Sequence, residues 1–416
     1  MSASKKIAIV SADAKLGSEL KGATRYVYLA ERLSAAGYQV DFITASFQHW
    51  EKRQRDVSHT DYQAHSFNLV FLDEPSYPNN MCVQRIWAHH VLARRVAAYF
   101  KTHTDYNLIY CQIPPNDVTR AAGRAAHRLH IPFVVDVNDV WPEAFEIAFS
   151  VPVLSRVLFA PFAAQARAAY QLANAVVGTS EEYTHRAFQD RAEDIPKRTV
   201  YVGNDLAVFD AGAAQYAASV IKPDDEFWVS YAGNISKLYD LSTLVLASVK
   251  AASEVPGLKV KLLGDGPTRA ELEALIGESG APAECLGYMP YEQMAAYLVA
   301  SDVVVNSLVA HAPQSVPTKI GDYLASGSVL VNTSLSPEFC AKVTADGFGV
   351  NVYPGDVDAL ARVLVNVARD DAARARMSTC ARHVAEAEFD RASSYTTIVE
   401  LIDELVGGPE LDVAKL

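Results

Sequence analysis

The feature that most constrains the fold is a regular alternation of short apolar runs with longer helix-like segments. The runs expected to form strands in the first half are 7–11, 40–44, 67–72, 108–112, 133–137, 175–178 and 201–203. Those expected in the second half are 227–232, 259–263, 284–286, 303–306, 329–332 and 349–352. Helical segments separate these runs, among them 24–36, 241–252, 269–279, 291–300 and 357–368. Strands that alternate with helices in this way predict parallel sheets covered by helices.

The length of the chain indicates more than one domain. A chain of 416 residues is too long for a single core. Two consecutive βα series predict an α/β protein with two doubly wound, Rossmann-like domains that face each other across a cleft. In such sheets ligands bind at the carboxyl ends of the strands. Residues 206–226 lack a strong apolar pattern, so we place the interdomain connection there and expect domains at 1–205 and 206–389, with a helical tail at 390–416.

Charge and cysteine content exclude several classes of function. The net charge of −12 and the sequence pI of about 5.4 argue against nonspecific nucleic-acid binding. The five cysteines are scattered without a CxxC pair, which argues against a disulfide framework and a zinc cluster and favours a reducing compartment. No signal peptide and no run of about 20 apolar residues is evident. We therefore expect a cytoplasmic protein.

The segment 314–327 joins two apolar runs through a polar loop and the start of a helix. A helix N-terminus favours anions, and Ser315, Thr318 and Lys319 add two hydroxyls and a cation there. Asp322 lies three residues after Lys319 on the same helical face, where a carboxylate can accept bonds from a ribose diol. An ordinary βα loop with a capped helix also accounts for this pattern.

Two further loops carry features of a phosphate site. Gly17 and Gly22 lie in the first βα loop, but their spacing is not GxGxxG, and a surface loop explains them as well. The strand that ends at Gly233 is followed by Asn234 and by Lys237, before the next helix. Lys237 and Lys319 together would neutralise two phosphate charges without a metal. A solvated surface lysine is the alternative for Lys237.

A carboxylate at a strand end is the candidate for activating an acceptor. Asp139 follows the run 133–137, in the segment 136–143, and can orient or deprotonate a hydroxyl. Its alternative role is to cap the next helix. The histidines show no metal-ligand spacing, so we expect neither a metal nor another cofactor.

The segment 317–327, Pro-Thr-Lys-Ile-Gly-Asp-Tyr-Leu-Ala-Ser-Gly, resembles the nucleotide-sugar loop of retaining GT-B glycosyltransferases of family 4. The resemblance is to members that build bacterial polysaccharides. Their two acidic positions, separated by seven residues, are occupied here by Gln314 and Asp322. Asp322 keeps the charge on a shorter arm, and Gln314 keeps hydrogen-bonding capacity without the charge.

The resemblance implies a GT-B fold and a retaining glycosyltransferase that uses a nucleotide-diphosphate sugar. It implies that the first domain binds the acceptor, the second binds the donor, and the tail 390–416 packs back onto the first domain. Catalytic roles would fall to Asp139, Lys319 and Gln314. Other residues of the loops described above would contact the donor or the acceptor, and a tyrosine would stack on the base. Those contact residues are Gly17, Gly22, Asn234, Lys237, Tyr288, Ser315, Thr318 and Asp322.

The expected acceptor is a glycan or a lipid-linked saccharide of cell-surface polysaccharide. Two basic-aromatic segments, 49–55 and 85–95, would allow contact with the inner face of a membrane that carries a polyprenyl-linked acceptor. Solvated helix faces explain both segments as well. Two other functions remain open: a nucleotide-sugar epimerase or hydrolase on the same fold, and a non-catalytic nucleotide-sugar-binding partner.

Overall fold

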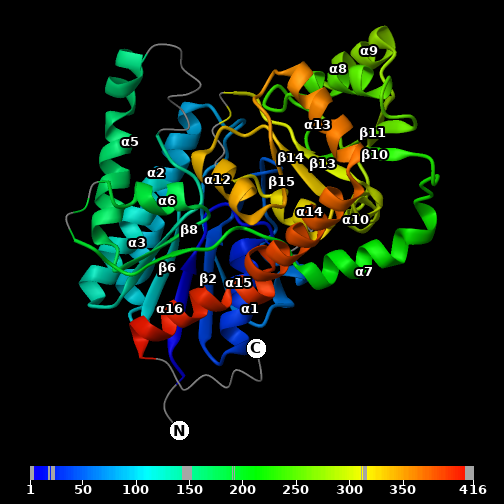
Figure 1. The fold of residues 1–416 in the computed structure, drawn as a ribbon. Helices are drawn as coiled ribbons and strands as arrows, with labels where there is room; N and C mark the ends of the chain where they lie inside the picture. The colour runs from blue at the N-terminus through cyan, green and yellow to red at the C-terminus, as the bar shows by residue number, and fades with distance from the viewer. Residues whose placement is uncertain are drawn as a thin grey trace. The chain divides into compact units, whose positions relative to one another are not determined.

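The computed structural model describes residues 4–16, 19, 24–142, 152–189, 191, 193–310, 312 and 316–407, without the side chains of 152–158. The chain divides into two compact units. The first comprises Met1–Val200 and Tyr395–Leu416, and the second comprises Tyr201–Ser394. Each unit is an α/β structure built around its own parallel sheet (Figure 1).

The first unit is built on a seven-stranded sheet in the order β5-β2-β1-β6-β7-β8-β9. All of its strand pairs are parallel. The strands are β1 (Lys6–Val10), β2 (Gln39–Ala45), β5 (Asn68–Leu72), β6 (Leu108–Ile113), β7 (Phe133–Val137), β8 (Ala175–Gly178) and β9 (Lys197–Thr199). The helices are α1 (Arg25–Ala35), α2 (Val83–Thr102), α3 (Asn116–Leu129), α5 (Pro152–Leu172), α6 (Glu181–Arg186) and α16 (Thr396–Val406). A small antiparallel pair, β3 (Phe47–Gln48) and β4 (Arg53–Gln54), follows β2.

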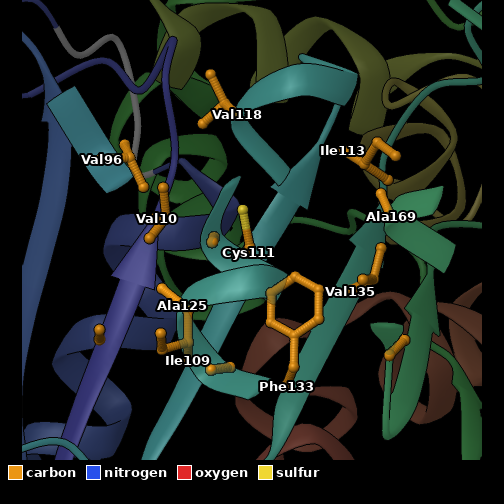
Figure 2. Close-up of a cluster of buried hydrophobic side chains, with 14 of the residues drawn as sticks. Val10, Val96, Ile109, Cys111, Ile113, Val118, Ala125, Phe133, Val135 and Ala169 are labelled. Carbon is orange, nitrogen blue, oxygen red and sulfur yellow. The ribbon is translucent and has the colours of Figure 1, made fainter. Parts of the chain in front are cut away.

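Alternate residues of these strands supply two separate cores, because successive side chains of a strand point to opposite faces. Val10, Cys111 and Val135 belong to the core beneath α2, α3 and α5, and Figure 2 shows Val10 near Val96 of α2 and Val135 near Ala169 of α5. Their strand neighbours face α1 and α16 instead. The sheet is therefore buried on both sides, as parallel sheets require.

The second unit is built on a six-stranded parallel sheet in the order β12-β11-β10-β13-β14-β15. Its strands are β10 (Phe227–Ala232), β11 (Leu258–Leu263), β12 (Ala283–Gly287), β13 (Val303–Asn306), β14 (Val329–Asn332) and β15 (Gly349–Asn351). Its first helices are α7 (Leu206–Tyr216), α8 (Leu241–Ala252), α9 (Arg269–Ser279), α10 (Tyr291–Ala300) and α11 (Ile320–Ala325). Those that follow are α12 (Pro337–Asp346), α13 (Val357–Arg369), α14 (Asp371–Val384), a π-helical turn (Ala385–Phe389) and α15 (Arg391–Ser394).

One expectation about the middle of the chain is wrong. Residues 201–203 are not a strand, because the last strand of the first sheet is β9, and Arg391 instead binds the carbonyl oxygens of Val202 and Gly203. In the segment 206–226, where the interdomain connection is predicted, the first eleven residues form α7. This helix packs against α10, and Gly212 allows the close approach, since a Cβ there would lie 2.8 Å from the Cα of Glu292.

Candidate functional site

Three loops are joined by backbone hydrogen bonds at the carboxyl edge of the second sheet. Gly233 after β10 donates its N–H to Leu263, and Gly264 after β11 donates to Gly287 at the end of β12, each at 2.8 Å. Gly264 has φ 140°, and a Cβ there would lie 1.9 Å from the carbonyl oxygen of Gly233. The loops can therefore pack this closely only with glycine at this position. The result is a rigid rim beside the switch point between β10 and β13, where open α/β sheets bind ligands.

Lys319 places an unpaired amine at this rim. Its Nζ lies 4.1 Å from the ring centroid of Tyr231 and 3.9 Å from that of Tyr239. The amine is buried and has no hydrogen-bond partner among the described residues. Burial lowers the pKa of Lys319 well below its usual value. Among the described residues this buried amine contacts two aromatic faces and no anion, so a bound anion would favour its protonated form and supply the missing partner.

The helix that carries Lys319 is fixed to β10 by a second tyrosine. The hydroxyl of Tyr323 in α11 accepts the N–H of Ala232 at 2.8 Å and donates to its carbonyl oxygen at 3.0 Å. Tyr323 is fully buried. Since Lys319 stands at the N-terminal boundary of the same helix, this pair of bonds holds the amine against the end of β10.

Asp322 faces other elements than Lys319 does. Its Oδ1 accepts hydrogen bonds from the side-chain amide of Asn204, at 2.9 Å, and from the hydroxyl of Tyr291, at 2.6 Å. Burial raises the pKa of this carboxyl, and the two bonds partly offset the rise. The i, i+3 spacing thus brings the two residues onto one short helix, while their charged groups contact different parts of the unit.

The other predicted residues of the second unit lie on exposed loops. Asn234, Lys237 and Thr318 are exposed, and Tyr288 is 61% exposed. The carbonyl oxygen of Asn234 accepts the hydroxyl of Tyr231 at 2.7 Å, which joins this loop to the ring beneath Lys319. Lys237 is exposed and makes no side-chain ion pair or hydrogen bond with the described residues. The predicted residues Gly17, Gly22, Gln314 and Ser315 lie outside the described residues.

Asp139 lies just past the carboxyl end of β7 in the first unit. One of its oxygens accepts the N–H of Val140 at 2.8 Å, and the other accepts the indole N–H of Trp141 at 3.0 Å. Burial raises the pKa of the carboxyl, and these two bonds act against the rise. The side chain is half-buried, so it combines a fixed orientation with an altered basicity, as a group that positions a hydroxyl needs.

Glu74 is a second carboxyl at this edge of the first sheet, and it was not among the residues predicted from the sequence. Glu74 follows β5, is 4% exposed, and its Oε1 has no hydrogen-bond partner among the described residues. Burial and the nearby charge of Asp13 raise its pKa to about 8. Its position after a strand was the available signal, since carboxyl ends of parallel strands gather at one edge.

Arg85 supplies the positive charge near these carboxyls. Its guanidinium lies 4.7 Å from the ring centroid of Trp141 and 6.0 Å from that of Tyr77. Its charge lowers the pKa values of Asp13, Glu74 and Asp139 against the dominant effect of burial. The segment 85–95 was singled out for a membrane role, and the position of Arg85 among carboxyls could not be inferred from its sequence neighbours.

The described residues contain no group of three or more His, Cys, Asp or Glu arranged to hold a metal ion. What the two edges offer is a buried amine without a partner among the described residues in one unit, and carboxyls of raised pKa in the other. The first suits a phosphate, and the second suits a hydroxyl that must be oriented or deprotonated.

Comparison with known proteins agrees with this architecture. Residues 226–370 match the family model described as glycosyl transferases group 1. No curated protein sequence matches the chain. The structure of HepE from Anabaena in complex with UDP matches with a TM-score of 0.70 and 18% identity, over 96% of this chain and 100% of that one. Sucrose-phosphate synthase from Thermosynechococcus elongatus matches with a TM-score of 0.68 and 20% identity, over 97% and 100%. An Escherichia coli trehalose-6-phosphate structure bound with UDP-2-fluoro glucose matches with a TM-score of 0.67 and 12% identity, over 95% and 99%.

The fold is therefore the GT-B fold of glycosyltransferases, with two parallel-sheet units as the sequence predicted. The second unit carries the sequence pattern of group 1 glycosyltransferases over residues 226–370. The resemblance to GT-B glycosyltransferases is confirmed at this level, and assignment to family 4 stays a prediction.

Proposed function

We propose that the protein is a retaining glycosyltransferase that moves a sugar from a nucleotide-diphosphate donor to a saccharide or lipid-linked saccharide in cell-surface polysaccharide biosynthesis. The observation that carries the proposal is the buried, unpartnered amine of Lys319 at the carboxyl end of β10. Matched structures hold UDP and UDP-2-fluoro glucose, which supports a uridine diphosphate sugar as the first donor to test.

In this reaction the bond between the sugar C1 and the diphosphate oxygen breaks, and C1 forms a bond to an acceptor hydroxyl oxygen. Negative charge accumulates on the departing diphosphate. An amine that is protonated as that charge develops, and that is held in place where water is excluded, stabilises the departing diphosphate, and the Lys319 amine is buried in this way. We assign diphosphate contacts also to Lys237, Ser315 and Thr318, loop contacts to Gly17, Gly22 and Asn234, and base stacking to Tyr288.

The remaining roles concern the sugars. We assign the ribose hydroxyls to Asp322, whose Oδ1 is already bonded to Tyr291 and Asn204, so that its second oxygen serves the ligand. We assign the donor sugar to Gln314. Asp139 orients the acceptor hydroxyl, and the acceptor proton leaves with the diphosphate or through Asp139. No metal or other cofactor enters this scheme.

The test is to incubate the protein with UDP-, GDP- and dTDP-sugars and measure nucleotide diphosphate release with and without saccharide acceptors. We expect one donor class to be consumed, and NMR of the product to show the anomeric configuration of the donor retained. Lys319→Met should lower affinity for the nucleotide diphosphate roughly 10- to 100-fold, the loss of one charged hydrogen bond. Lys250→Met, which removes a half-exposed lysine of α8, is the matched control and should change nothing.

The same assay separates the two other candidate functions. Formation of an epimerised nucleotide sugar would identify an epimerase, and binding without turnover would identify a non-catalytic partner. Donor affinity unchanged in folded Lys319→Met would remove the assignment of the site.

We propose further that the first unit contacts an anionic membrane surface where a lipid-linked acceptor resides, at the cytoplasmic face. Helices α2, α3 and α5 have a strong excess of basic residues in a chain of net charge −12, and their single acid is Asp117. The basic residues are Arg85, Arg94, Arg95, Lys101, Arg120, Arg124, Arg128, Arg156 and Arg167. Beside them Met81, Val83, Ile86 and Trp87 are exposed. Apolar side chains among basic ones favour an anionic lipid surface.

Sedimentation with vesicles tests this contact. Within the described residues no helix combines the length and apolarity needed to cross a bilayer. We expect co-sedimentation with phosphatidylglycerol vesicles but not with phosphatidylcholine vesicles, and its loss in Arg94→Glu/Arg95→Glu. Arg362→Glu/Arg376→Glu makes the same charge change at exposed positions of the second unit and should keep binding. Equal loss of vesicle binding in both double variants would exclude α2 as the membrane-binding surface.

A further inference from the structure

A cavity of about 400 Å³ lies in the first unit among residues of α2, α3 and α5. Its walls include Ile86, Trp87, Trp141 and Phe162, and Asn116 and Asp117 supply polar atoms. Cavities of this size hold a small organic ligand. None of the residues discussed above for the donor belongs to this cavity.

Asn116 lines the cavity and has an unused hydrogen-bond acceptor. The residue is 3% exposed, and its amide nitrogen donates to the carbonyl oxygens of Trp141, at 3.1 Å, and Phe162, at 3.2 Å. These two acceptors fix the orientation of the amide, because a flipped amide would place oxygen against oxygen. The Oδ1 atom is therefore the free end, and it is buried without a partner among the described residues. Leaving it unpaired is unfavourable, so a ligand that donates a hydrogen bond there is favoured.

Asp117 adds a second acceptor and excludes one class of ligand. Its carboxylate is 9% exposed and accepts the N–H of Val118 at 3.0 Å. Among the described residues that line the cavity there is no Lys or Arg. His90 also lines the cavity, and its charge and that of Arg120 lower the pKa of Asp117 against the larger effect of burial. A phosphate group would thus meet a carboxyl group and no Lys or Arg of the lining, whereas a hydroxyl can donate to Asp117 and to Asn116 alike.

The aromatic side chains that line the cavity favour one kind of hydrogen-bonding ligand over others. Trp87 is 58% exposed at the rim, and Trp141 stacks with His89 at an interplanar angle of 23°. A flat aromatic face suits the apolar C–H face of a sugar ring, whose edge carries hydroxyls. A purely apolar chain would fill the cavity but leave Asn116 Oδ1 unpaired. A hydroxylated ring satisfies both parts of the lining.

We propose that this cavity binds a neutral sugar unit, with its ring face on Trp87 and its hydroxyls donating to Asn116 and Asp117. Sugar binding in this cavity does not depend on the proposed function. Only the statement that this sugar is part of the acceptor rests on it. The proposal makes the acceptor a saccharide rather than a simple alcohol or a bare lipid phosphate, and it gives the first unit a sugar-recognition site built from α2 and α3.

The probes are methyl glycosides of glucose, galactose, mannose and N-acetylglucosamine, added without nucleotide and followed by saturation-transfer NMR and tryptophan fluorescence. We expect at least one to bind, and Trp87→Ala to weaken it roughly 3- to 10-fold, as loss of a stacked aromatic contact does. Asp117→Asn should weaken it as well. Tyr353→Ala removes an aromatic side chain that is 65% exposed in the second unit and should leave binding unchanged.

The proposal is overturned if no glycoside binds the folded protein, or if binding is the same in Trp87→Ala and in Tyr353→Ala. Binding of decanol or decyl phosphate that Trp87→Ala abolishes, in the absence of glycoside binding, would show a lipid cavity and would equally overturn it. Because no nucleotide is present, these outcomes are independent of the donor site. Loss of UDP binding in Lys319→Met tests that site separately.

Discussion

At the scale of single residues, the Lys319 amine couples ligand binding to protonation. Burial lowers its pKa well below the usual value, so over the range between that pKa and 10.5 the unfolded chain holds a proton that the folded protein lacks. Stability without ligand therefore rises with pH across this range. A bound diphosphate favours the charged amine and therefore raises the pKa of Lys319 in the folded protein.

We therefore expect the affinity for UDP to fall as pH rises, with proton uptake on binding. The measurement is titration calorimetry at several pH values between about 7 and 10, where the terminal phosphate, with a pKa of about 6, is already ionised. Repeating it in buffers of different ionisation enthalpy gives the number of protons taken up. Lys319→Met should abolish the uptake, and a binding heat independent of buffer in the unaltered protein would contradict the assignment.

Glu74 gives the opposite dependence of stability on pH. Its pKa rises from 4.5 to about 8, so between these values the folded protein holds a proton that the unfolded chain has lost. Stability contributed by this group is present at low pH and is lost as pH rises through about 8. Glu74→Gln, which mimics the neutral acid, should flatten the fall in unfolding temperature across that window, as measured by calorimetry. Glu404→Gln, at an exposed ion pair with Arg198, should leave the slope unchanged.

At the scale of elements, the contact between α11 and β10 can be tested with a single substitution. Tyr323→Phe would remove both hydrogen bonds to Ala232 and leave its buried backbone groups without these partners. We expect a loss of about 1–3 kcal/mol in the free energy of unfolding of the second unit. UDP affinity should also fall, because α11 carries Lys319. Tyr353→Phe, at an exposed position, is the control for both readouts.

Elements were predictable from sequence where local signals agreed with packing. Strands β7, β10, β13 and β14 and helices α8, α9 and α10 fall within their expected bounds, because each combines a clear period with a stop signal such as Gly280 after α9. Helix α7 was missed because its buried residues are few and include Gly212, whose role is a contact with α10 that no local pattern reveals.

The candidate site divides in the same way. Lys319 and Asp139 could be selected from the sequence because they follow strands in recognisable segments. The partners that define their chemistry could not, since Tyr231 and Tyr239 meet Lys319 only after the strand and the helix pack together. Asn204, which binds Asp322, lies 118 residues away in the chain.

At the scale of the molecule, Arg25 links three distant segments of the chain within the first unit through a buried ion pair and hydrogen bonds. Arg25 of α1 contacts Asp136 of β7 at 2.7 Å, and both side chains are almost fully buried. The guanidinium also donates to the hydroxyl of Tyr395 and to the carbonyl oxygen of Val200. Beyond Tyr395, residues Ile398, Val399, Leu401 and Ile402 complete the core on that face of the sheet.

Breaking this ion pair should destabilise the first unit specifically. Arg25→Ala leaves Asp136 charged and buried without its cation, which costs about 3–5 kcal/mol. We expect urea denaturation, followed by hydrogen exchange resolved along the chain, to show early opening of the first unit and little change in the second. Arg376→Ala, at an exposed position of α14, should show neither effect. Equal loss of protection in both units would contradict the expectation that the first unit alone is destabilised.

The return of α16 to the first sheet has a consequence for biosynthesis (Figure 1). Residues 395–407 leave the ribosome only after every residue of the second unit has emerged. During synthesis one side of the sheet in the first unit therefore stays incompletely covered, while all the residues of the second unit have already emerged. For this chain the order of synthesis and the order of completion are reversed, so the window for chaperone binding or aggregation belongs to the part made first.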